Sequence, residues 1–571
     1  MRIKIIRYLI IGLFCMVVLD LFYIQAVRGK YFYNLSVNNM IRVVPLEGWR
    51  GRIFDRNGNI LADNQNSYNV MITGQEVKNA EEIFTFLADV LNIPRKEIIK
   101  KYNQKKTAPF IPVVVVDKIT NEQAIIIEEN RFRFPGLIVQ EGFKRNYPLE
   151  ENSAHVLGHV NKINQSKIKK FKEYGYSPQS IVGYSGVEEF YDSYLRGEDG
   201  GLQIEVNSRG NQVRLLSLKE PSKGQDLVLT IDKDIQQLSM DLLQDKIGSI
   251  VIMDTDNGQI LGMTSFPSFN PNHFLEANNQ DKVSRLFRDG RAPLMNRAIT
   301  GQYPPGSVFK VLVALAGLDL KKITNKTNYI CQGNFEYGGT NFGCTHVHGS
   351  QNLIESLAHS CNVYYYYLGL KIGADQIFNY ANMLGMNDLT HVDLPFEKKG
   401  RIPSRHFGIL PRKRSWYTGD TINMSIGQGE VLTTPIQLVQ MMSAVFREGV
   451  VVQPHVIYSI GGYRVNEFDG QRRLKLKESD FKEVKKGLRE TVTDYAGTAH
   501  ILNLKEVYVA GKTGTAQAGK DREHHAWFVG YAKGEKKNIA FCVFLEHGGS
   551  SLNACLLAKD LLLGLFQNKK I

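Results

Sequence analysis

Apolar residues are most concentrated near the start of the chain. Segment 8–27, which follows the basic residues Arg2, Lys4 and Arg7, contains twenty mostly apolar residues, about the length that a helix needs to cross a hydrocarbon core of roughly 30 Å. Residues 24–28 offer no convincing small-residue cleavage site, so the segment predicts an uncleaved, single-pass anchor in the cell membrane. The basic residues before it predict a cytoplasmic N-terminus, with the bulk of the chain extracytoplasmic.

Short apolar runs bounded by turn residues predict a sheet beyond residue 224. The predicted strands are 226–231, 248–254, 259–263, 506–510, 526–531 and 538–544. Asp256-Asn257-Gly258 is a turn sequence, so the second and third strands should form a hairpin. Helical patterns cover 307–320 and 354–370, and the apolar tail 554–566 is too short to span a membrane, so it should be a terminal helix packed on the sheet. The pattern indicates an α/β domain with helices on both faces of the sheet.

The composition limits the class of protein. A length of 571 residues is too great for one ordinary domain, and 43% hydrophobic with 22% charged residues is typical of a globular protein. The net charge of +13 comes from lysines and arginines spread along the chain, without a nucleic-acid-binding motif. We therefore expect a basic surface that faces anionic lipid or wall polymer, and no nucleic acid partner.

A serine and a lysine three residues apart follow a Pro-Gly break near the middle of the chain. If a helix begins at this break, Ser307 and Lys310 lie one turn apart on the same face, so the amine can reach the hydroxyl. A serine hydroxyl is a weak nucleophile until a neighbouring group takes its proton. A lysine can take that proton only where its surroundings keep it neutral.

Two further motifs follow the Ser307–Lys310 pair. Their order along the chain distinguishes this pair from a chance occurrence of Ser-x-x-Lys. Ser360-Cys361-Asn362 begins 53 residues after Ser307, and Lys512-Thr513-Gly514-Thr515 begins 152 residues later. Together the three resemble the S-x-x-K, S-x-N and K-T-G motifs of penicillin-binding proteins and serine β-lactamases. Ser-x-x-Lys also occurs at Ser166 and Ser479, but there it lies in charged stretches that predict solvated helix faces.

The segment before the predicted sheet carries motifs of its own. Residues 50–58 predict a short strand and an Asn-Gly turn, and they resemble the R-G-x-I-x-D-R-N-G signature of class B penicillin-binding proteins. The resemblance continues at 145–148, 154–158, 183–188 and 195–197. In that family this region is a pedestal that lifts the catalytic domain from the membrane and meets partner proteins. We expect an anchor at 1–29, a pedestal (dimerisation-type) domain at 30–220 and a transpeptidase domain at 221–571.

The resemblance covers nearly the whole chain. Further matches lie at 425–429, 434–435 and 525–532, and Tyr303-Pro304-Pro305-Gly306 is more similar to penicillin-binding protein 2 of cell elongation than to the division paralogue. The resemblance implies an α/β (α+β) fold with a central antiparallel sheet flanked by helices, and a D,D-transpeptidase activity on peptidoglycan stem peptides that β-lactams inhibit. It also implies no cofactor for the chemistry, and a SEDS-family membrane glycosyltransferase of the RodA type with other elongation proteins as partners.

The resemblance also implies roles for the motif residues. Ser307 would attack the carbonyl between the two terminal D-alanines, Lys310 would take its proton, and the backbone N–H groups of Ser307 and Thr515 would hold the oxyanion. Ser360 would relay a proton to the departing amine, and Asn362 would bond the peptide and steady Lys310. The substrate's terminal carboxylate would be bound by the third motif, which consists of Lys512, Thr513, Gly514 and Thr515. The charge of the lysine in that motif would lower the pKa of Lys310.

Three of the six cysteines form a set with a histidine. Cys331, Cys344, His348 and Cys361 have the spacing C-x12-C-x3-H-x12-C, and Cys361 is the middle residue of the second motif. Three sulfurs and an imidazole are a tetrahedral ligand set for structural zinc. In an oxidising exterior a Cys331–Cys344 disulfide is an alternative, and unpaired buried thiols are a third.

Two other functions share these features. A β-lactamase or β-lactam sensor would have the same three motifs, but it would also need a means of bringing water to the acyl-enzyme, or a signalling segment, and we identify neither. The second alternative is a scaffold whose main task is to activate a membrane glycosyltransferase. The presence of Ser307, Lys310 and Lys512 favours retained chemistry.

Overall fold

A computed structural model of the chain describes residues 2–33, 41–46, 48–74, 76–77, 79–106, 112–170, 176, 180–206, 212–276, 279–405, 415–468, 470–519 and 522–571. The chain forms two compact units, each combining segments that are distant in sequence. The first unit consists of residues 1–51, 64–144 and 196–224, and the second of residues 52–63, 145–195 and 225–571.

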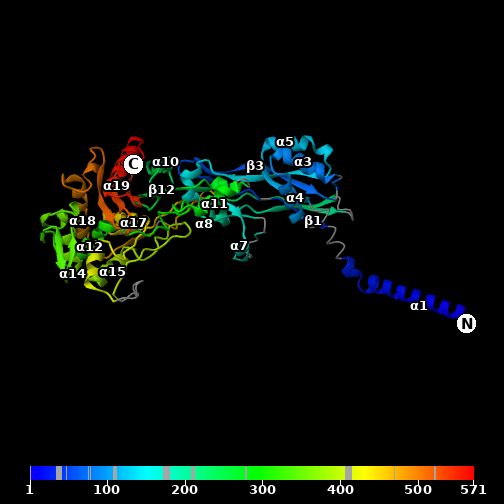
Figure 1. The fold of residues 1–571 in the computed structure, drawn as a ribbon, viewed down its shortest axis with the longest axis horizontal. Coiled ribbons are helices and arrows are strands. Elements are labelled where there is room, and N and C mark those ends of the chain that lie inside the picture. Colours follow the sequence, from blue (N-terminus) through cyan, green and yellow to red (C-terminus); the bar gives the residue numbers. More distant parts are fainter. Residues whose placement is uncertain are drawn as a thin grey trace. The chain divides into compact units, whose positions relative to one another are not determined.

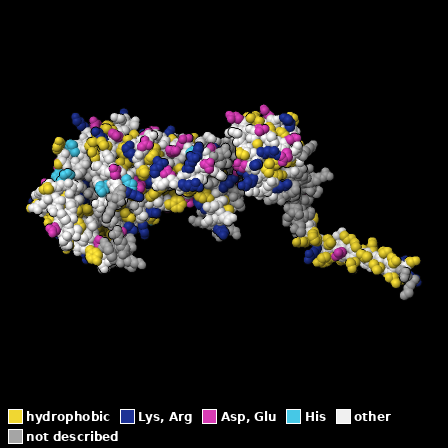
Figure 2. All heavy atoms as spheres, viewed as in Figure 1, with side chains coloured by type: hydrophobic (Ala, Val, Ile, Leu, Met, Phe, Trp, Pro, Cys, Tyr) yellow, Lys and Arg dark blue, Asp and Glu magenta, His cyan; other side chains and the backbone are white. Residues whose placement is uncertain are grey.

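The N-terminal segment is helical, as its apolar run predicts. α1 (Arg2–Phe22) continues into a π-helical turn, η1 (Tyr23–Val27). Among the residues described, Ile3–Val27 is the one helix long and apolar enough to cross a membrane. Its large apolar side chains are exposed, and the helix that is blue in Figure 1 is covered with hydrophobic side chains on the face seen in Figure 2. An apolar surface of this extent is stable when lipid surrounds it.

The rest of the first unit has a small α/β core and a separate sheet. In the core, β4 (Pro112–Ile119) and β5 (Leu137–Asn146) both pair with β3 (Ile60–Thr73). Against these strands pack α3 (Ala80–Leu91), α4 (Arg95–Lys105) and α5 (Asn121–Glu129), and the 3-10 turn η2 (Arg131–Arg133) follows α5. Leu87, Ile98 and Ile127 of the helices are fully buried there. The separate antiparallel sheet has the order β1 (Ile41–Leu46), β8 (Gly200–Val206) and β9 (Gln212–Lys219).

The strand and turn predicted at 50–58 are present. β2 (Ile53–Phe54) pairs with the start of β3 across the turn that contains Gly58. The buried carboxylate of Asp55 accepts hydrogen bonds from the N–H groups of Asn57 and Asn59, each at 2.8 Å. Such side-chain bonds to the local backbone fix a turn.

A five-stranded antiparallel sheet forms the centre of the second unit. Its spatial order is β12 (Ile260–Phe266), β11 (Gly248–Asp254), β23 (Asn538–Leu545), β22 (His525–Lys533) and β21 (Tyr508–Ala516). The hairpin predicted at 248–263 is confirmed as β11 and β12. β21, which carries the third motif, is an edge strand.

Helices cover both faces of this sheet, because alternate strand residues point to opposite sides. Trp527 and Phe544 belong to one buried cluster, with α12 (Lys310–Asp319) and α17 (Pro435–Phe446). Phe528 and Phe541 belong to the other cluster, with α10 (Lys233–Leu243) and α19 (Ser551–Gln567). α10 and α19 are neighbours in Figure 1, so the apolar tail is a terminal helix packed on the sheet, as predicted.

The second unit contains further helices, turns and strands. They are η3 (Glu150–Ser153), α6 (Ala154–Leu157), β6 (Val160–Lys162), α7 (Gln165–Lys170), β7 (Ile181–Gly183), α8 (Gly186–Phe190), α9 (Asp192–Leu195), β10 (Leu227–Leu229), η5 (Pro271–Leu275), α11 (Gln280–Arg288), η7 (Gly306–Phe309), β13 (Tyr329–Cys331), β14 (Asn334–Tyr337), β15 (Thr340–Gly343), β16 (Gly349–Gln351), α13 (Leu353–Ala358), α14 (Asn362–Ile372), α15 (Ala374–Met383), α16 (Thr418–Ser425), β17 (Val450–Val452), β18 (Ile457–Ile460), β19 (Tyr463–Arg464), β20 (Gln471–Arg473), α18 (Glu478–Thr493) and η8 (His500–Leu502).

Two predicted elements differ from the structure at the motifs. The continuous helix expected at 354–370 is broken into α13 and α14, because Ser360 adopts a left-handed φ of +57°. The strand expected at 506–510 continues as β21 to Ala516. Glycine and lysine are poor strand formers, so this extension depends on pairing with β22, where Lys512 lies opposite Val529.

Candidate active site

The first motif lies where a tight turn packs against the edge of the sheet. The 3-10 turn η7 begins at Gly306 and continues directly into α12 at Lys310. Gly306 has a φ of +55°, and a Cβ there would lie 2.8 Å from Thr515 O, so both the conformation and the close approach to β21 favour glycine. Residues three apart are eclipsed in a 3-10 turn. Ser307 and Lys310 therefore share a face, although the turn differs from the α-helix that the sequence predicts.

Lys310 joins the first motif to the second. Its side chain is completely buried, and Nζ donates to Ser360 O at 2.7 Å, to Asn362 Oδ1 at 2.7 Å and to Ser360 Oγ at 3.4 Å. Burial lowers the pKa of Lys310 from 10.5 to about 8, because removal from water disfavours the ammonium form. The amine can therefore lose its proton near neutral pH, as a general base must.

The second motif occupies the break between α13 and α14. The left-handed conformation of Ser360 is costly for a residue other than glycine, and it allows both the carbonyl and the hydroxyl of Ser360 to meet Lys310. Asn362 begins α14 and is held by two further bonds. Its Nδ2 donates to Gly343 O at 3.2 Å, and its backbone N–H donates to Cys344 Sγ at 3.2 Å.

The lysine of the third motif is buried beside that of the first. Burial, together with the charge of Lys310, lowers the pKa of Lys512 well below its usual value. For Lys310 itself, the lowered pKa comes from burial; the predicted contribution of the Lys512 charge stays a prediction. Lys512 Nζ lies 3.4 Å from Thr513 Oγ1, which is also buried.

The rest of the third motif faces η7, the turn that carries Ser307 and that we call the nucleophile turn. A Cβ on Gly514 would lie 2.8 Å from Pro305 O, so the strand and the turn meet backbone to backbone. Thr515 is exposed, and its carbonyl accepts a hydrogen bond from Gln428 Nε2 at 3.4 Å. The eight predicted catalytic and substrate-binding residues thus lie on three adjoining segments: η7 with the start of α12, the α13–α14 break, and β21.

The same combination of units occurs in known proteins. Residues 248–562 match the family model described as the penicillin binding protein transpeptidase domain, and residues 45–229 match the penicillin-binding protein dimerisation domain. The peptidoglycan D,D-transpeptidase MrdA of Acinetobacter baumannii is 31% identical over 94% of this chain and 83% of its own length. This chain belongs to the class B penicillin-binding proteins of the elongation type.

Solved structures of this class agree with the assignment. The complex between penicillin-binding protein 2 (PBP2) and MreC from Helicobacter pylori has a TM-score of 0.83 and 27% identity, covering 93% of this chain and 100% of the matched chain. A structure on the coordination of polymerization and crosslinking by a peptidoglycan synthase complex has a TM-score of 0.75 and 28% identity, covering 99% and 98%. This class B penicillin-binding protein is a serine D,D-transpeptidase of peptidoglycan that acts in cell elongation.

Two residues that sequence reasoning did not single out contact the motifs of this class B penicillin-binding protein. The buried ring of Tyr365 has its centroid 5.4 Å from Lys310 Nζ. Thr498 Oγ1 lies 2.8 Å from Thr513 Oγ1. Tyr365 follows the second motif by less than one helical turn, and that spacing is a usable signal. Nothing in the local sequence distinguishes Thr498, whose contact depends on packing.

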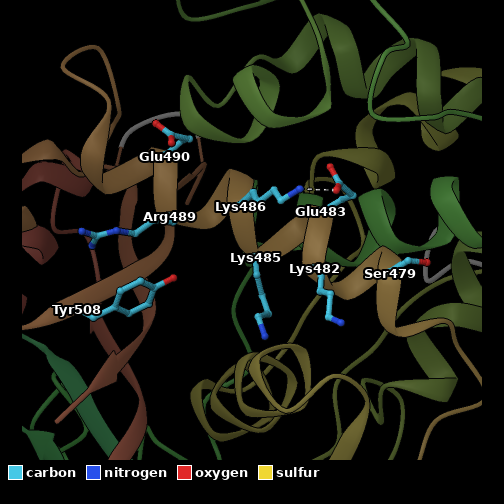
Figure 3. A pocket seen from close by; sticks show the side chains of 8 residues that line it. All are labelled: Ser479, Lys482, Glu483, Lys485, Lys486, Arg489, Glu490 and Tyr508. Carbon is cyan, nitrogen blue, oxygen red and sulfur yellow. Dashed lines mark hydrogen bonds and ion pairs between the residues drawn. The ribbon is translucent and has the colours of Figure 1, made fainter. Parts of the chain in front are cut away.

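The other serine–lysine pairs lie on exposed helix surfaces, as predicted. Ser166 and Lys169 are exposed on α7, and Ser479 and Lys482 are exposed on α18. The latter pair lines a surface groove of about 490 Å³ with other charged side chains. Figure 3 shows that the Ser479 hydroxyl and the Lys482 amine point in different directions. A solvated lysine that points away from its serine is not positioned to take a proton from it.

The predicted cysteine set forms a cluster beside the second motif. The ligand atoms of Cys331, Cys344, His348 and Cys361 lie within 4.8 Å of one another, and His348 Nδ1 is 3.5 Å from both Cys331 Sγ and Cys344 Sγ. All three cysteines are free in this structure. Hydrogen bonds from the Cys361 thiol and the Asn362 N–H lower the pKa of Cys344. Tetrahedral zinc ligands at about 2.0 to 2.3 Å from the metal lie roughly 3.5 Å apart, so these side chains fit zinc.

Proposed function

We propose that Ser307 forms an acyl-enzyme with the stem peptide and that Lys310 is its general base. The observation that carries this proposal is the burial of Lys310 against Ser360 and Asn362, which holds an amine with a pKa of about 8 next to the nucleophile turn. Neutral Lys310 takes the Ser307 proton as Oγ attacks the carbonyl between the terminal D-alanines. The N–H groups of Ser307 and Thr515 stabilise the oxyanion, and Ser360 passes a proton to the departing D-alanine amine.

The second half of the reaction restores the enzyme. An amine of a neighbouring stem peptide attacks the acyl carbon, the ester bond to Ser307 Oγ breaks, and the new amide is the cross-link. The proton lost by the attacking amine returns to Ser307 Oγ through Lys310 or Ser360.

The third motif binds the terminal carboxylate of the donor peptide. Thr513 and Thr515 donate hydroxyl hydrogen bonds to it, and Gly514 keeps the strand close to the nucleophile turn. An arriving carboxylate favours the charged form of Lys512, which is otherwise disfavoured by burial. Substrate binding therefore charges Lys512, and this charge in turn favours neutral Lys310.

Labelling with benzylpenicillin tests this function. We expect a single adduct in the intact mass of the protein, mapped to Ser307, because the β-lactam acylates the same nucleophile as the D-alanyl-D-alanine end. Ser307→Ala should abolish the adduct. Ser479→Ala, which changes the serine of the exposed pair on α18, should leave it unchanged. An adduct on Ser166 or Ser479 would contradict the proposal, and loss of the adduct within seconds would favour a β-lactamase.

The same proposal includes a structural zinc ion held by Cys331, Cys344, His348 and Cys361. Three thiols and an imidazole whose ligand atoms lie within 4.8 Å of one another support it. When bound, zinc would supply a rigid link among β13, the segment after β15 and the start of α14, and no chemistry of its own. Because Cys361 lies between Ser360 and Asn362, this link would hold the second motif in place.

We further propose the following domains, membrane topology and partners. Residues 1–29 form a single-pass anchor with a cytoplasmic start, residues 30–220 form the pedestal, and residues 221–571 form the extracytoplasmic transpeptidase domain. The apolar exposed surface of α1 supports the anchor. Structures of related proteins with MreC and within a peptidoglycan synthase complex support elongation partners. We infer that a SEDS-family glycosyltransferase of the RodA type is among them.

A further inference from the structure

The turn that follows α18 is compact and polar. Asp494 is the C-cap of this helix, and its Oδ1 accepts a hydrogen bond from the Ala496 N–H at 2.9 Å. The carbonyl of Asp494 accepts another from the Gly497 N–H at 3.0 Å. These bonds fold residues 494–498 into a tight turn, which we call the bridging turn.

One side of the bridging turn holds the two residues that precede the second motif. Asp494 Oδ2 lies 3.2 Å from His359 Nε2, and the Thr498 N–H donates to Ala358 O at 3.1 Å. The second ring nitrogen of His359, Nδ1, lies 2.9 Å from Gln351 Oε1. Both ring nitrogens therefore have a partner, and the ring cannot rotate without losing one of these bonds.

The other side of the bridging turn contacts the third motif. Thr498 Oγ1 lies 2.8 Å from Thr513 Oγ1, which is itself 3.4 Å from Lys512 Nζ. The supporting helices are in close contact as well, because a Cβ on Gly487 of α18 would lie 2.5 Å from Leu357 Cδ1 of α13. One short turn thus connects the second motif with the third.

This connection matters because Ser360 is strained. A serine with a φ of +57° keeps that conformation only when its surroundings hold it. The side chain of His359, the residue before Ser360, is held by Gln351 and by the carboxylate of Asp494. We propose that the bridging turn sets the relative position of Ser360 and Thr513, with Asp494 as a positioning residue for acylation. This inference rests on the proposed function of Ser307.

Asp494 is the residue to change, because it touches neither the reacting groups nor the cysteine cluster. His359 is less suitable, since its ring stacks on His348 with centroids 6.1 Å apart. Asp494→Asn keeps an oxygen for the Ala496 N–H but loses the charge that faces His359. Asp494→Ala loses both contacts. A merely structural role would therefore reduce thermal stability and acylation together, and most strongly in the alanine variant.

Acylation of the full-length protein by benzylpenicillin distinguishes a positioning role of Asp494 from a merely structural one. Rapid kinetics give the dissociation constant of the non-covalent complex and the rate constant of acylation. We expect both variants to lower the acylation rate constant roughly tenfold, as a small misplacement of catalytic groups does, with the dissociation constant changed less than about twofold. The melting temperature should fall in Asp494→Ala only, because only this variant loses the acceptor of the Ala496 N–H hydrogen bond. His359→Gln combined with Asp494→Asn should be no slower than the slower single variant, because the residues act as one unit.

Glu448→Gln is the matched control. It removes a carboxylate, located just after α17, that pairs with Lys485 of α18 at 2.8 Å. Its acylation rate constant should equal that of the wild type. Metal content should be the same in Asp494→Asn and in the wild type. If the wild type is labelled on Ser307 and Asp494→Asn is acylated at the wild-type rate, the positioning role of the bridging turn is wrong but the proposed function stands. The same conclusion follows if Asp494→Asn loses metal in parallel with its acylation rate. A wild type that is not labelled on Ser307 would overturn the proposed function, and this inference with it.

Discussion

Lys310 is the residue whose environment most directly determines the chemistry. Burial lowers its pKa from 10.5 to about 8, so the neutral form that can accept a proton is the minor species below pH 8 and the major species above it. We expect the rate of acylation by benzylpenicillin to rise with pH through about 8 and then to level off. Stopped-flow measurement across that range tests this, and a rate independent of pH would contradict it.

Substitution of the same lysine separates charge from basicity. A guanidinium stays protonated at any pH that the protein tolerates, so Lys310→Arg should be as inactive as Lys310→Ala, with acylation roughly a thousandfold or more below the wild type. Lys485→Arg, a change of the same kind on α18, should label normally. Substantial acylation of Lys310→Arg would mean that Lys310 serves only as a fixed positive charge.

At the scale of elements, the break between α13 and α14 depends on the segment around the cysteine cluster. We expect about one zinc per chain in protein purified without chelators, and we expect Cys361→Ser to lower both metal content and penicillin labelling. Cys15→Ser, which changes an exposed thiol in α1, should leave both unchanged. A metal-free protein whose mass indicates a Cys331–Cys344 crosslink would instead support the disulfide.

The contact between η7 and β21 leaves no room for a side chain. A Cβ on Gly514 would lie 2.8 Å from Pro305 O, so Gly514→Ala should lower the free energy of unfolding by about 1–3 kcal/mol and slow acylation. Gly290→Ala, at a position with open space around it, should change stability by less than about 0.5 kcal/mol. Urea unfolding and penicillin labelling of the two variants provide the comparison.

For the whole molecule, the anchor and the pedestal should determine location and partners, and the transpeptidase domain at 221–571 should determine chemistry. Deletion of residues 1–29 should release the protein from membranes while Ser307 is still labelled, because no motif residue lies in the deleted segment. Co-purification with a RodA-type glycosyltransferase should require residues 1 to about 220. Equal recovery of that partner by a chain starting near Gly224 would show that the pedestal is not the binding region.

Local patterns in the sequence were sufficient for several of these features. The apolar run predicts α1, the turn at 256–258 predicts the β11–β12 hairpin, and the order of the motifs predicts the family, because each depends on neighbouring residues or on their order along the chain. The charged stretches likewise predict that Ser166 and Ser479 lie on exposed helices.

Only the tertiary structure decided the geometry of the motifs and the pKa of Lys310, because these features depend on groups that are far apart in the chain. The left-handed Ser360 breaks a helix that its own sequence favours, and the pairing of Lys512 with Val529 makes a strand of a glycine-rich segment. The lowered pKa of Lys310 comes from the core that closes over it. The contact of the bridging turn with Thr513 exists only after α18 has packed on α13, since packing alone brings Thr498 to the third motif.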